Sequence, residues 1–318
     1  MAQVVFAGGA ALGGTITGLK ALLTLLDLGL CLLVALLLKR LELPAWRAAL
    51  YAWHPLPVVE IAGSGHVDGA GLALLLAAVC LLLPGRREST GTGGRPWPFL
   101  LSGALLAAAG LVKLFPFIPA PLLFFMVPPG RRRYFAAGFL AALAALLLPF
   151  LPHLANMAAT LDAYARNWEF AGFAFNVLRA VTGSGTGARL LLSSCFLLAA
   201  ATIMLHCIRG IGCGAPSAAG MRRALGACYA MAMAFLLLTP TLQPWYALCL
   251  AVFLPFSPGP AGLVLCWAVF LAYRVQIPYF IQGQWLESMP VTTAIFLAPI
   301  TAYLAGGFFR RKRQATEC

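Results

Sequence analysis

Long runs of Leu, Ala, Val and Phe alternate along the chain with short polar or Pro/Gly-rich breaks. The runs lack the period-2 alternation that predicts strands, and several approach the roughly 20 residues that a helix needs to cross a bilayer. They predict eleven apolar helical segments, some short enough to be re-entrant. The approximate bounds are residues 19–38, 48–62, 67–83, 98–112, 116–128, 134–151, 188–208, 224–238, 245–256, 261–277 and 291–309.

Composition indicates that lipid is the solvent of these segments. Of the 318 residues, 62% are hydrophobic and 10% are charged, which is too apolar for a water-facing surface. Hydrocarbon cannot satisfy backbone N–H and C=O groups, so spanning segments must be helices or closed barrels, and the long runs favour helices. We expect an all-α, polytopic transmembrane helical bundle that forms a single domain over residues 1–318, with no separate soluble domain.

Five basic segments lie on one side of the membrane if each apolar segment crosses once. They are residues 39–47, 86–95, 131–133, 209–223 and 310–313, and they hold sixteen of the twenty-two Lys and Arg residues. The positive-inside rule makes this side the cytoplasm, so we expect a multi-pass protein of the cytoplasmic (inner) membrane with its N-terminus outside. The net charge of +13 then reflects topology, and nucleic acid is not an expected partner.

Acidic residues gather on the opposite, outer side. Six of the nine acids lie within or beyond the membrane there: Asp27, Glu60, Asp68, Asp162, Glu169 and Glu287. The longest outer segment is a loop at about residues 152–187, and its aromatic residues favour an ordered structure such as an interfacial helix. No CxxC spacing is present, so the sequence predicts neither a metal site nor a cofactor.

The densest polar signal is the stretch from Tyr51 to Gly71, YAWHPLPVVEIAGSGHVDGAG. Three ionisable residues, Glu60, His66 and Asp68, flank a Gly-Ser-Gly break, and such groups are costly in or near lipid. Glycine permits a sharp turn and close approach of a ligand, and a His beside an Asp suits acid/base chemistry near neutral pH. These three are candidate catalytic residues; the alternative is a polar surface turn in which His66 caps a helix.

Two cations on the outer side are candidate ligands for a lipid phosphate. Lys113 precedes a proline-broken helix in GLVKLFPFIPAP, and the planar guanidinium of Arg179 matches phosphate oxygens bidentately. Each has a simpler alternative, since Lys113 can extend to the membrane interface and Arg179 can pair with Glu169.

Further outer residues are candidates for substrate binding. Two prolines interrupt residues 239–246, TPTLQPWY, and a proline-broken backbone at membrane depth must be buried in protein or line a wet cavity. An interfacial turn with a Trp/Tyr anchor is the alternative. The expected topology returns all the polar clusters to one face, which predicts one shared polar cavity. The substrate-binding candidates are Glu169, Asn176, Gln243, Trp245, Tyr246 and Glu287.

Four motifs occur in order along nearly the whole chain: WHPL at 53–56, GHVD at 65–68, LVKLFP at 111–116 and PTLQPWY at 240–246. They resemble, in turn, the W-N-P-L, G-H-N-D, T-K-x-x-P and S-P-T-x-x-P-W-Y motifs of the GT-C superfamily of polytopic glycosyltransferases. His54 and Val67 stand where that family has Asn. In particular, the chain resembles bacterial polyprenyl-phosphate-mannose-dependent α-mannosyltransferases and the mannosyltransferase of glycosylphosphatidylinositol anchor assembly.

This resemblance implies inverting transfer of a sugar, with mannose expected, from a polyprenyl-phosphate donor to a glycan or lipid acceptor at the outer face. Such a reaction needs a base to activate the acceptor hydroxyl and cations to stabilise the lipid-phosphate leaving group, usually without a metal. Asp68, followed by Glu60, is the best remaining candidate for the base, and the alternative role of either residue is to position the acceptor. Lys113 and Arg179 are the candidate cations.

The chain departs from this family at its start. The family has its usual catalytic acid in a first outer loop after a leading helix, whereas the first eighteen residues here contain no acid. We therefore expect that helix and loop to be missing, which keeps a catalytically inactive GT-C-like subunit as an alternative. Another alternative is a transporter or flippase for a lipid-linked or small polar substrate. It would spread charges through mid-membrane, where Asp27, Glu60 and Arg274 are the main ones.

Reporter fusions test the predicted topology. An enzyme reporter that is active only outside the cytoplasm should be silent when fused near Arg132 and active when fused near Thr160, because three consecutive arginines mark the first position as cytoplasmic. Reporter activity in intact cells, normalised to the abundance of each fusion, is the measurement. The reverse pattern would invert the topology.

Overall fold

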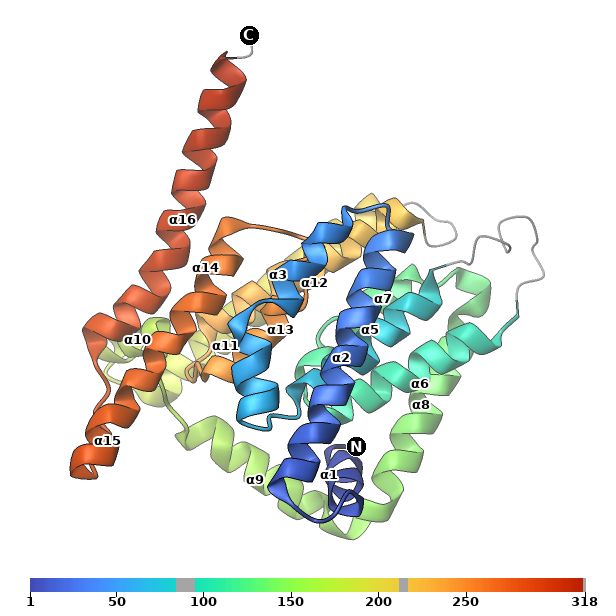
Figure 1. Cartoon of the computed structure of the whole chain (residues 1–318), viewed down its shortest axis with the longest axis horizontal. Coiled ribbons are helices and arrows are strands. Elements are labelled where there is room, and N and C mark those ends of the chain that lie inside the picture. The colour runs from blue at the N-terminus through green and yellow to red at the C-terminus, as the bar shows by residue number, and fades with distance from the viewer. Residues whose placement is uncertain (84–94, 212–216, 317–318) are drawn as a thin grey trace.

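The computed structural model describes residues 1–83, 95–211 and 217–316, and Figure 1 shows them as a bundle of helices. No strand occurs in these parts of the chain, where extended pairing consists of isolated bridges from Phe170 and Ala171 to Thr241. The all-α class predicted from the apolar runs is confirmed. Of the basic segment expected at 86–95, all but Arg95 lies outside the described residues, as does 212–216 of the segment at 209–223.

The chain enters the bundle through two helices, α1 (Ala2–Ala11) and α2 (Ile16–Arg40). Thr15 starts α2 as its N-cap, since its hydroxyl accepts the Gly18 N–H at 3.0 Å. Lys39 and Arg40 lie in the last turn of α2, where cations interact favourably with the negative end of the helix dipole. A side-chain cap thus defines the start of α2, and two cations stabilise its end.

A bent helix pair follows α2. The first limb contains η1 (Ala45–Ala48), α3 (Ala49–Ala52), α4 (Pro55–Pro57) and the π-helical η2 (Val58–Gly63), and the second limb is α5 (Asp68–Leu82). Between Pro55–Gly63 and Asp68–Leu82 the helix axis bends by 118°. The bend coincides with the predicted Gly-Ser-Gly break.

The next group comprises α6 (Trp97–Val112), η3 (Phe115–Phe117), α7 (Ala120–Met126), η4 (Pro129–Arg131) and α8 (Arg132–Leu147). Two glycines allow α6 and α8 to approach each other closely. A Cβ atom added to Gly103 would lie 2.0 Å from the carbonyl oxygen of Phe135, and one added to Gly138 would lie 1.9 Å from that of Leu100. Such distances are possible only for glycine, as in other close helix contacts in membranes.

The predicted loop at 152–187 is largely helical. It contains the end of η5 (Leu148–His153), α9 (Leu154–Asn167), α10 (Phe173–Thr182) and the start of α11 (Gly185–Gly210). In Figure 1, α9 crosses the lower end of the bundle. None of the α9 residues is buried, whereas Phe175 of α10 is fully buried.

The last third of the chain supplies the innermost backbone. Its elements are α12 (Ala218–Leu238), η6 (Pro244–Ala247), α13 (Leu248–Ala251), α14 (Pro260–Ala268), η7 (Val269–Val275), α15 (Gln276–Gln282) and α16 (Met289–Thr316). Every residue from 247 to 254 is at most 8% exposed. The proline-broken segment that leads into α13 is therefore surrounded by protein, which supplies the shielding that such a backbone needs at membrane depth.

Six helices in the described residues are long and apolar enough to cross a membrane, or seven if the bent pair forms one span. Large apolar side chains such as Leu32, Leu198 and Phe280 are at least 70% exposed, as expected for a surface in contact with lipid. The chain is thus a multi-pass membrane protein by length and composition of its helices. The count of eleven crossings stays a prediction, because the other expected segments form shorter helices.

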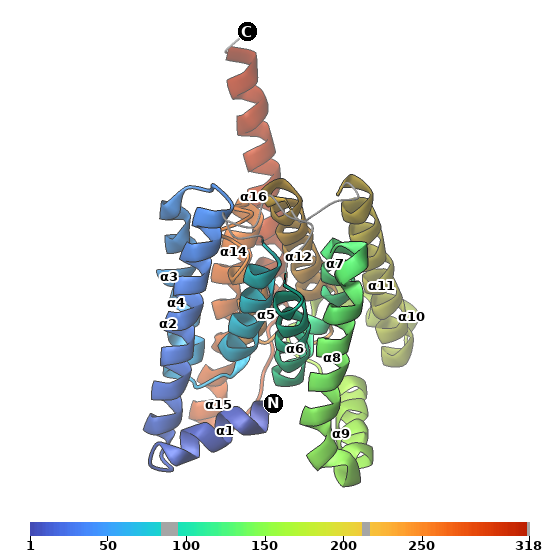
Figure 2. The same cartoon turned by 90° about the vertical axis from the view of Figure 1, so that its right-hand side faces the viewer.

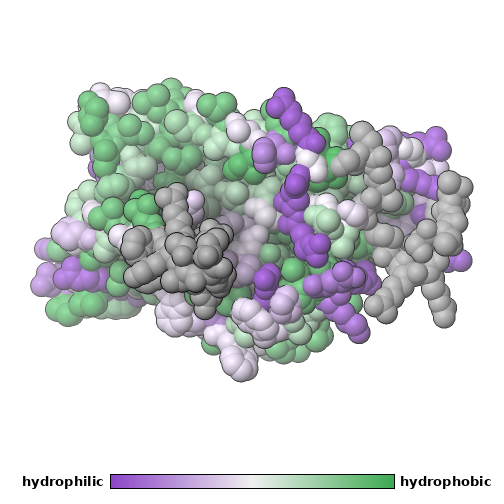
Figure 3. All heavy atoms as spheres, turned by 90° about the horizontal axis from the view of Figure 1, so that it is seen from above, coloured by the Kyte–Doolittle hydropathy of each residue, from purple (hydrophilic) through white to green (hydrophobic). Residues whose placement is uncertain are grey.

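Basic residues gather at one end of the bundle. Figures 1 and 2 show the end of α2, the α7–α8 junction and the α11–α12 junction at the upper end, with α1, α9 and α15 at the lower end. Figure 3 looks onto the upper end and shows a band of hydrophilic side chains there. Arg40 donates to the carbonyl of Cys80 and Arg222 to that of Leu41, both at 2.9 Å, so these arginines also satisfy carbonyls near helix ends. That this end faces the cytoplasm stays a prediction.

The glycine contact between α6 and α8 can be tested by adding one methyl group. Gly138→Ala should lower the thermal unfolding temperature of the purified protein, because relieving the overlap with Leu100 moves the helices apart at a cost of about 1–3 kcal/mol. Gly29→Ala in α2 is the matched control, since no atom lies within 4 Å of the added Cβ and alanine favours helix. Equal unfolding temperatures for the two variants would contradict this packing.

Candidate functional site

The break between η2 and α5 forms the base of the candidate site. Gly65 adopts a left-handed φ of 80°, a conformation that favours glycine, and the His66 N–H donates to the Glu60 carbonyl at 2.9 Å. The first turn of α5 approaches η2 so closely that a Cβ on Gly69 would lie 2.6 Å from Ile61 Cδ1. The predicted sharp turn is thus present, and it brings His66 and the start of α5 beside η2.

An ion pair connects α5 to α6 at this end of the bundle. Lys113 Nζ lies 3.3 Å from each carboxylate oxygen of Asp68. The Asp68 side chain is 10% exposed, whereas that of Lys113 is 36% exposed. Asp68 is the first residue of α5 and Lys113 is the C-cap of α6, so each charge lies at the helix end whose dipole stabilises it. Lys113 is therefore the partner of Asp68, and it also remains accessible to a ligand.

Aromatic side chains from the proline-broken segment contact Lys113 and the neighbouring His66. Lys113 Nζ lies 5.2 Å from the ring centroid of Tyr246, within range of a cation–π interaction. The imidazole of His66 stacks on Trp245 with ring centroids 4.1 Å apart. Trp245 and Tyr246 belong to η6, which begins directly after the buried residue Gln243. The two consecutive aromatics thus contact two different ionisable residues of the site.

Glu60 is fully buried beneath His66. Its carboxylate accepts a hydrogen bond from Tyr273, whose hydroxyl oxygen lies 2.8 and 3.0 Å from the two carboxylate oxygens. His66 Nε2 lies 3.6 Å from Glu60 Oε2. In this turn, outside both helices, burial is the main influence that lowers the pKa of His66 below its ordinary value, so the imidazole is neutral at pH 7. Glu60 is positioned to orient His66, and it does not reach the surface.

Six of the predicted site residues thus come together. We call Glu60, His66, Asp68, Lys113, Trp245 and Tyr246 the central cluster. The alternative in which His66 caps a helix does not fit, because Val67 is the N-cap residue of α5 and no side-chain hydrogen bond caps this helix.

Four other predicted residues, Glu169, Asn176, Arg179 and Glu287, form a second group together with Arg189, which the sequence did not predict; we call this group the loop cluster. Glu169 pairs with Arg179 through Oε2 and with Arg189 through Oε1, the latter at 2.8 Å. Arg179 also lies 3.4 Å from the amide oxygen of Asn176. Glu287 accepts the Ala171 N–H at 2.9 Å. The alternative of an Arg179–Glu169 ion pair is therefore what the structure contains.

A cavity of about 640 Å³ lies beside the loop cluster. Its lining includes Glu169, Asn176, Arg179 and Glu287 but no residue of the central cluster. The structure therefore divides the predicted residues between two places, where the sequence predicted one shared cavity. Arg179 stays away from the central cluster because its guanidinium is paired with Glu169.

One segment contacts both clusters. The hydroxyls of Tyr164 and Tyr246 hydrogen-bond to each other, and the Thr241 hydroxyl donates to the Trp168 carbonyl at 2.8 Å. The Leu242 N–H donates to the Phe170 carbonyl at 2.7 Å. Residues 164–171 thus connect the loop cluster to the proline-broken segment of the central cluster.

Two residues of the site, Arg189 and Tyr273, were not predicted from the sequence. The side chain of Arg189 is only 13% exposed, whereas that of Arg179 is 47% exposed. Arg189 could have been found, because a cation near the start of a helix such as α11 opposes the helix dipole and needs an acidic partner. Tyr273 had no such signal, since its partner Glu60 lies 213 residues away.

No group of three or more His, Cys, Asp or Glu residues suited to a metal ion occurs in the described residues. Comparisons with models of protein families, with curated proteins and with solved structures found no match. The fold identifies the chain as an all-α, multi-pass membrane protein. At the end opposite its basic residues it carries an accessible lysine, a buried carboxylate and an aromatic ring beside the lysine.

The Asp68–Lys113 pair can be tested by neutralising one or both partners. Lys113→Gln should lower the unfolding temperature more than Asp68→Asn, because it leaves the less exposed charge without its partner, at a cost of about 1–3 kcal/mol. The double variant D68N/K113Q should recover most of this loss. Thermal unfolding of the four purified proteins gives the coupling free energy, and strictly additive effects would show that the pair is not formed.

Proposed function

We propose that this chain is a membrane glycosyltransferase that transfers a sugar, mannose by resemblance, from a polyprenyl-phosphate donor to a glycan or lipid acceptor at the outer face. The observation that supports it best is the accessible Lys113 between the buried carboxylate of Asp68 and the ring of Tyr246, with Trp245 stacked on the neighbouring His66. A cation for the leaving phosphate, a base and an aromatic surface are the groups that this reaction requires.

Lys113 is the proposed ligand of the donor phosphate. Its ammonium already lies between a carboxylate and the Tyr246 ring, and its 36% exposure leaves room for a third group. A phosphate that approaches this ammonium competes with Asp68 for it, since both are anions. Arg179 is a weaker choice than the sequence indicated, because Glu169 already holds its guanidinium.

Asp68 is the proposed base. When the phosphate takes over Lys113, the Asp68 carboxylate is left without its counter-ion and can accept a hydrogen bond from the acceptor hydroxyl. The acceptor hydroxyl oxygen then forms a bond to the anomeric carbon, and the bond from that carbon to the phosphate oxygen breaks with its electron pair remaining on phosphate. The acceptor proton passes to Asp68, and Lys113 stabilises the polyprenyl phosphate that leaves.

The other residues of the site position the substrates in this proposal. Trp245 and Tyr246 offer ring faces to the sugar, and His66, stacked on Trp245 and oriented by Glu60, offers a neutral nitrogen to a hydroxyl. The polar residues Gln243, Glu169, Asn176 and Glu287 are proposed acceptor contacts.

The partners of the mid-membrane acids favour a transferase over a transporter. Asp27 accepts a hydrogen bond from Tyr51 at 2.6 Å, and Glu60 accepts one from Tyr273. Both acids are thus satisfied within the bundle, whereas a transport path through mid-membrane would leave such groups facing the substrate.

The activity test uses the stable double variant. D68N/K113Q should reduce transfer from a radiolabelled polyprenyl-phosphate sugar, in membranes containing the protein, by at least about 100-fold, because both the base and the phosphate ligand are absent. D162N/R166Q is the matched control, since it neutralises an exposed ion pair on the same outer side of the protein. Equal transfer by the two double variants would exclude the central cluster as the active site. Wild-type protein without transfer would support the inactive subunit.

A further inference from the structure

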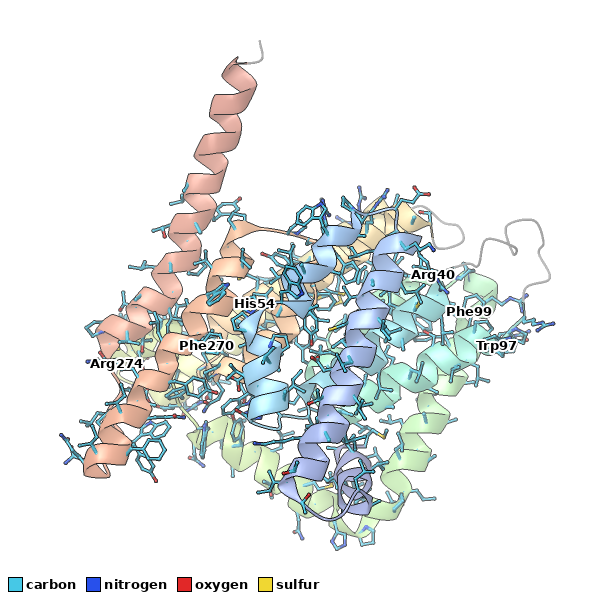
Figure 4. The ribbon with its side chains drawn as sticks, in the orientation of Figure 1. Arg40, His54, Trp97, Phe99, Phe270 and Arg274 are labelled. Carbon is cyan, nitrogen blue, oxygen red and sulfur yellow. The ribbon has the colours of Figure 1, made fainter. Side chains whose placement is uncertain are left out.

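Arg274 lies on a membrane-length helical segment and outside both clusters. It belongs to η7, eight residues before the end of the span Pro260–Gln282, so its Cα is about 12 Å from that end at 1.5 Å per residue. The side chain is exposed, and Figure 4 shows it at the edge of the bundle, near α15 and α16. A cation at this depth is costly in lipid unless a partner accompanies it.

The protein does not supply that partner within its described residues. The other arginines on this side, Arg166, Arg179 and Arg189, each pair with an acid. Arg274 forms no ion pair within residues 1–83, 95–211 and 217–307, the ranges whose side chains the structure describes. No acid among these described residues therefore serves as its counter-ion, and its exposed guanidinium is accessible to an anionic group of another molecule.

A cavity of about 620 Å³ adjoins this guanidinium. Arg274 lines it together with apolar side chains from α15 and the outer segment, including Phe170, Ile277, Ile281 and Leu286. Ser288 adds a hydroxyl from the turn before α16. One cation, a hydroxyl and an apolar wall match an amphiphile whose polar group is anionic.

Glu287 is the one acid that lines this cavity, and it does not neutralise Arg274. Its carboxylate accepts the Ala171 N–H at 2.9 Å, and no salt bridge joins it to the guanidinium. Glu287 lies on the exposed turn between α15 and α16, where water screens its charge. The cation is therefore the dominant charge for a group that approaches from the lipid side.

We infer that Arg274 and this cavity bind the phosphate group of a membrane lipid. The guanidinium presents its planar fork to two phosphate oxygens, and the hydrocarbon chain lies along Ile277 and Ile281. The phosphate can belong to a polyprenyl phosphate or to an anionic phospholipid. The site is separate from Lys113, because no residue of the central cluster lines the cavity. The inference therefore does not depend on the proposed transferase activity.

Lipid retention by the purified full-length chain tests this site. The D68N/K113Q background removes the phosphate ligand of the central cluster, so that the remaining binding reports on Arg274. In native mass spectra, this variant should bind one phosphate lipid, and adding Arg274→Gln should weaken the apparent affinity at least tenfold. Titrations with a polyprenyl monophosphate and with phosphatidylglycerol distinguish the two sources, and diacylglycerol serves as the lipid without phosphate.

The matched control is Arg166→Gln in the same background, which removes an exposed arginine from the same side and should leave affinity unchanged. Arg274→Lys should retain part of the affinity, since it keeps the charge but loses the fork; it also serves if the Gln variant does not fold. Equal binding by the Gln variant and its background, or equal binding of diacylglycerol, would overturn the assignment.

Discussion

The ion pair between Asp68 and Lys113 fixes the start of α5 relative to the end of α6, and the rest of the site is arranged around it. Asp68 starts α5 immediately after the bend, so the pair also sets where the η2–α5 turn lies. Tyr246 packs over Lys113 and hydrogen-bonds to Tyr164, which extends the arrangement to α9. Two helix dipoles stabilise the opposite charges, which explains how an ion pair persists in an apolar bundle.

Three acids of the bundle, the buried Glu60 and Asp68 and the half-buried Asp27, each have a hydrogen-bond donor at least 24 residues away in the chain. Asp27 has Tyr51, Glu60 has Tyr273 and Asp68 has Lys113. Neutral tyrosine donors satisfy the two acids inside spans without introducing another charge, whereas the cationic donor occurs where a ligand can approach. The choice of donor therefore separates structural carboxylates from the one that is proposed to react.

Much of the fold was predictable because lipid imposes strong rules on sequence. Apolar runs gave the all-α membrane class, and the Gly-Ser-Gly break gave the bend and the grouping of Glu60, His66 and Asp68. The division into two clusters was not predictable, since it depends on the ion pairs that Glu169 forms with Arg179 and Arg189. The segment at 152–187 was predicted as an ordered structure such as an interfacial helix, but not its division into α9 and α10, between which Phe170 hydrogen-bonds to Pro240 and Leu242, residues distant in sequence.

The glycine contact between α6 and α8 has a consequence for how a lipid can reach Lys113. Lys113 ends α6, and the backbones of α6 and α8 meet at Gly103 and Gly138 with no space even for a methyl group. A prenyl chain several ångströms thick cannot slide between these two helices. Lateral entry from the bilayer must therefore pass around the α6–α8 seam, and that seam acts as a closed wall for any lipid on its way to the lysine.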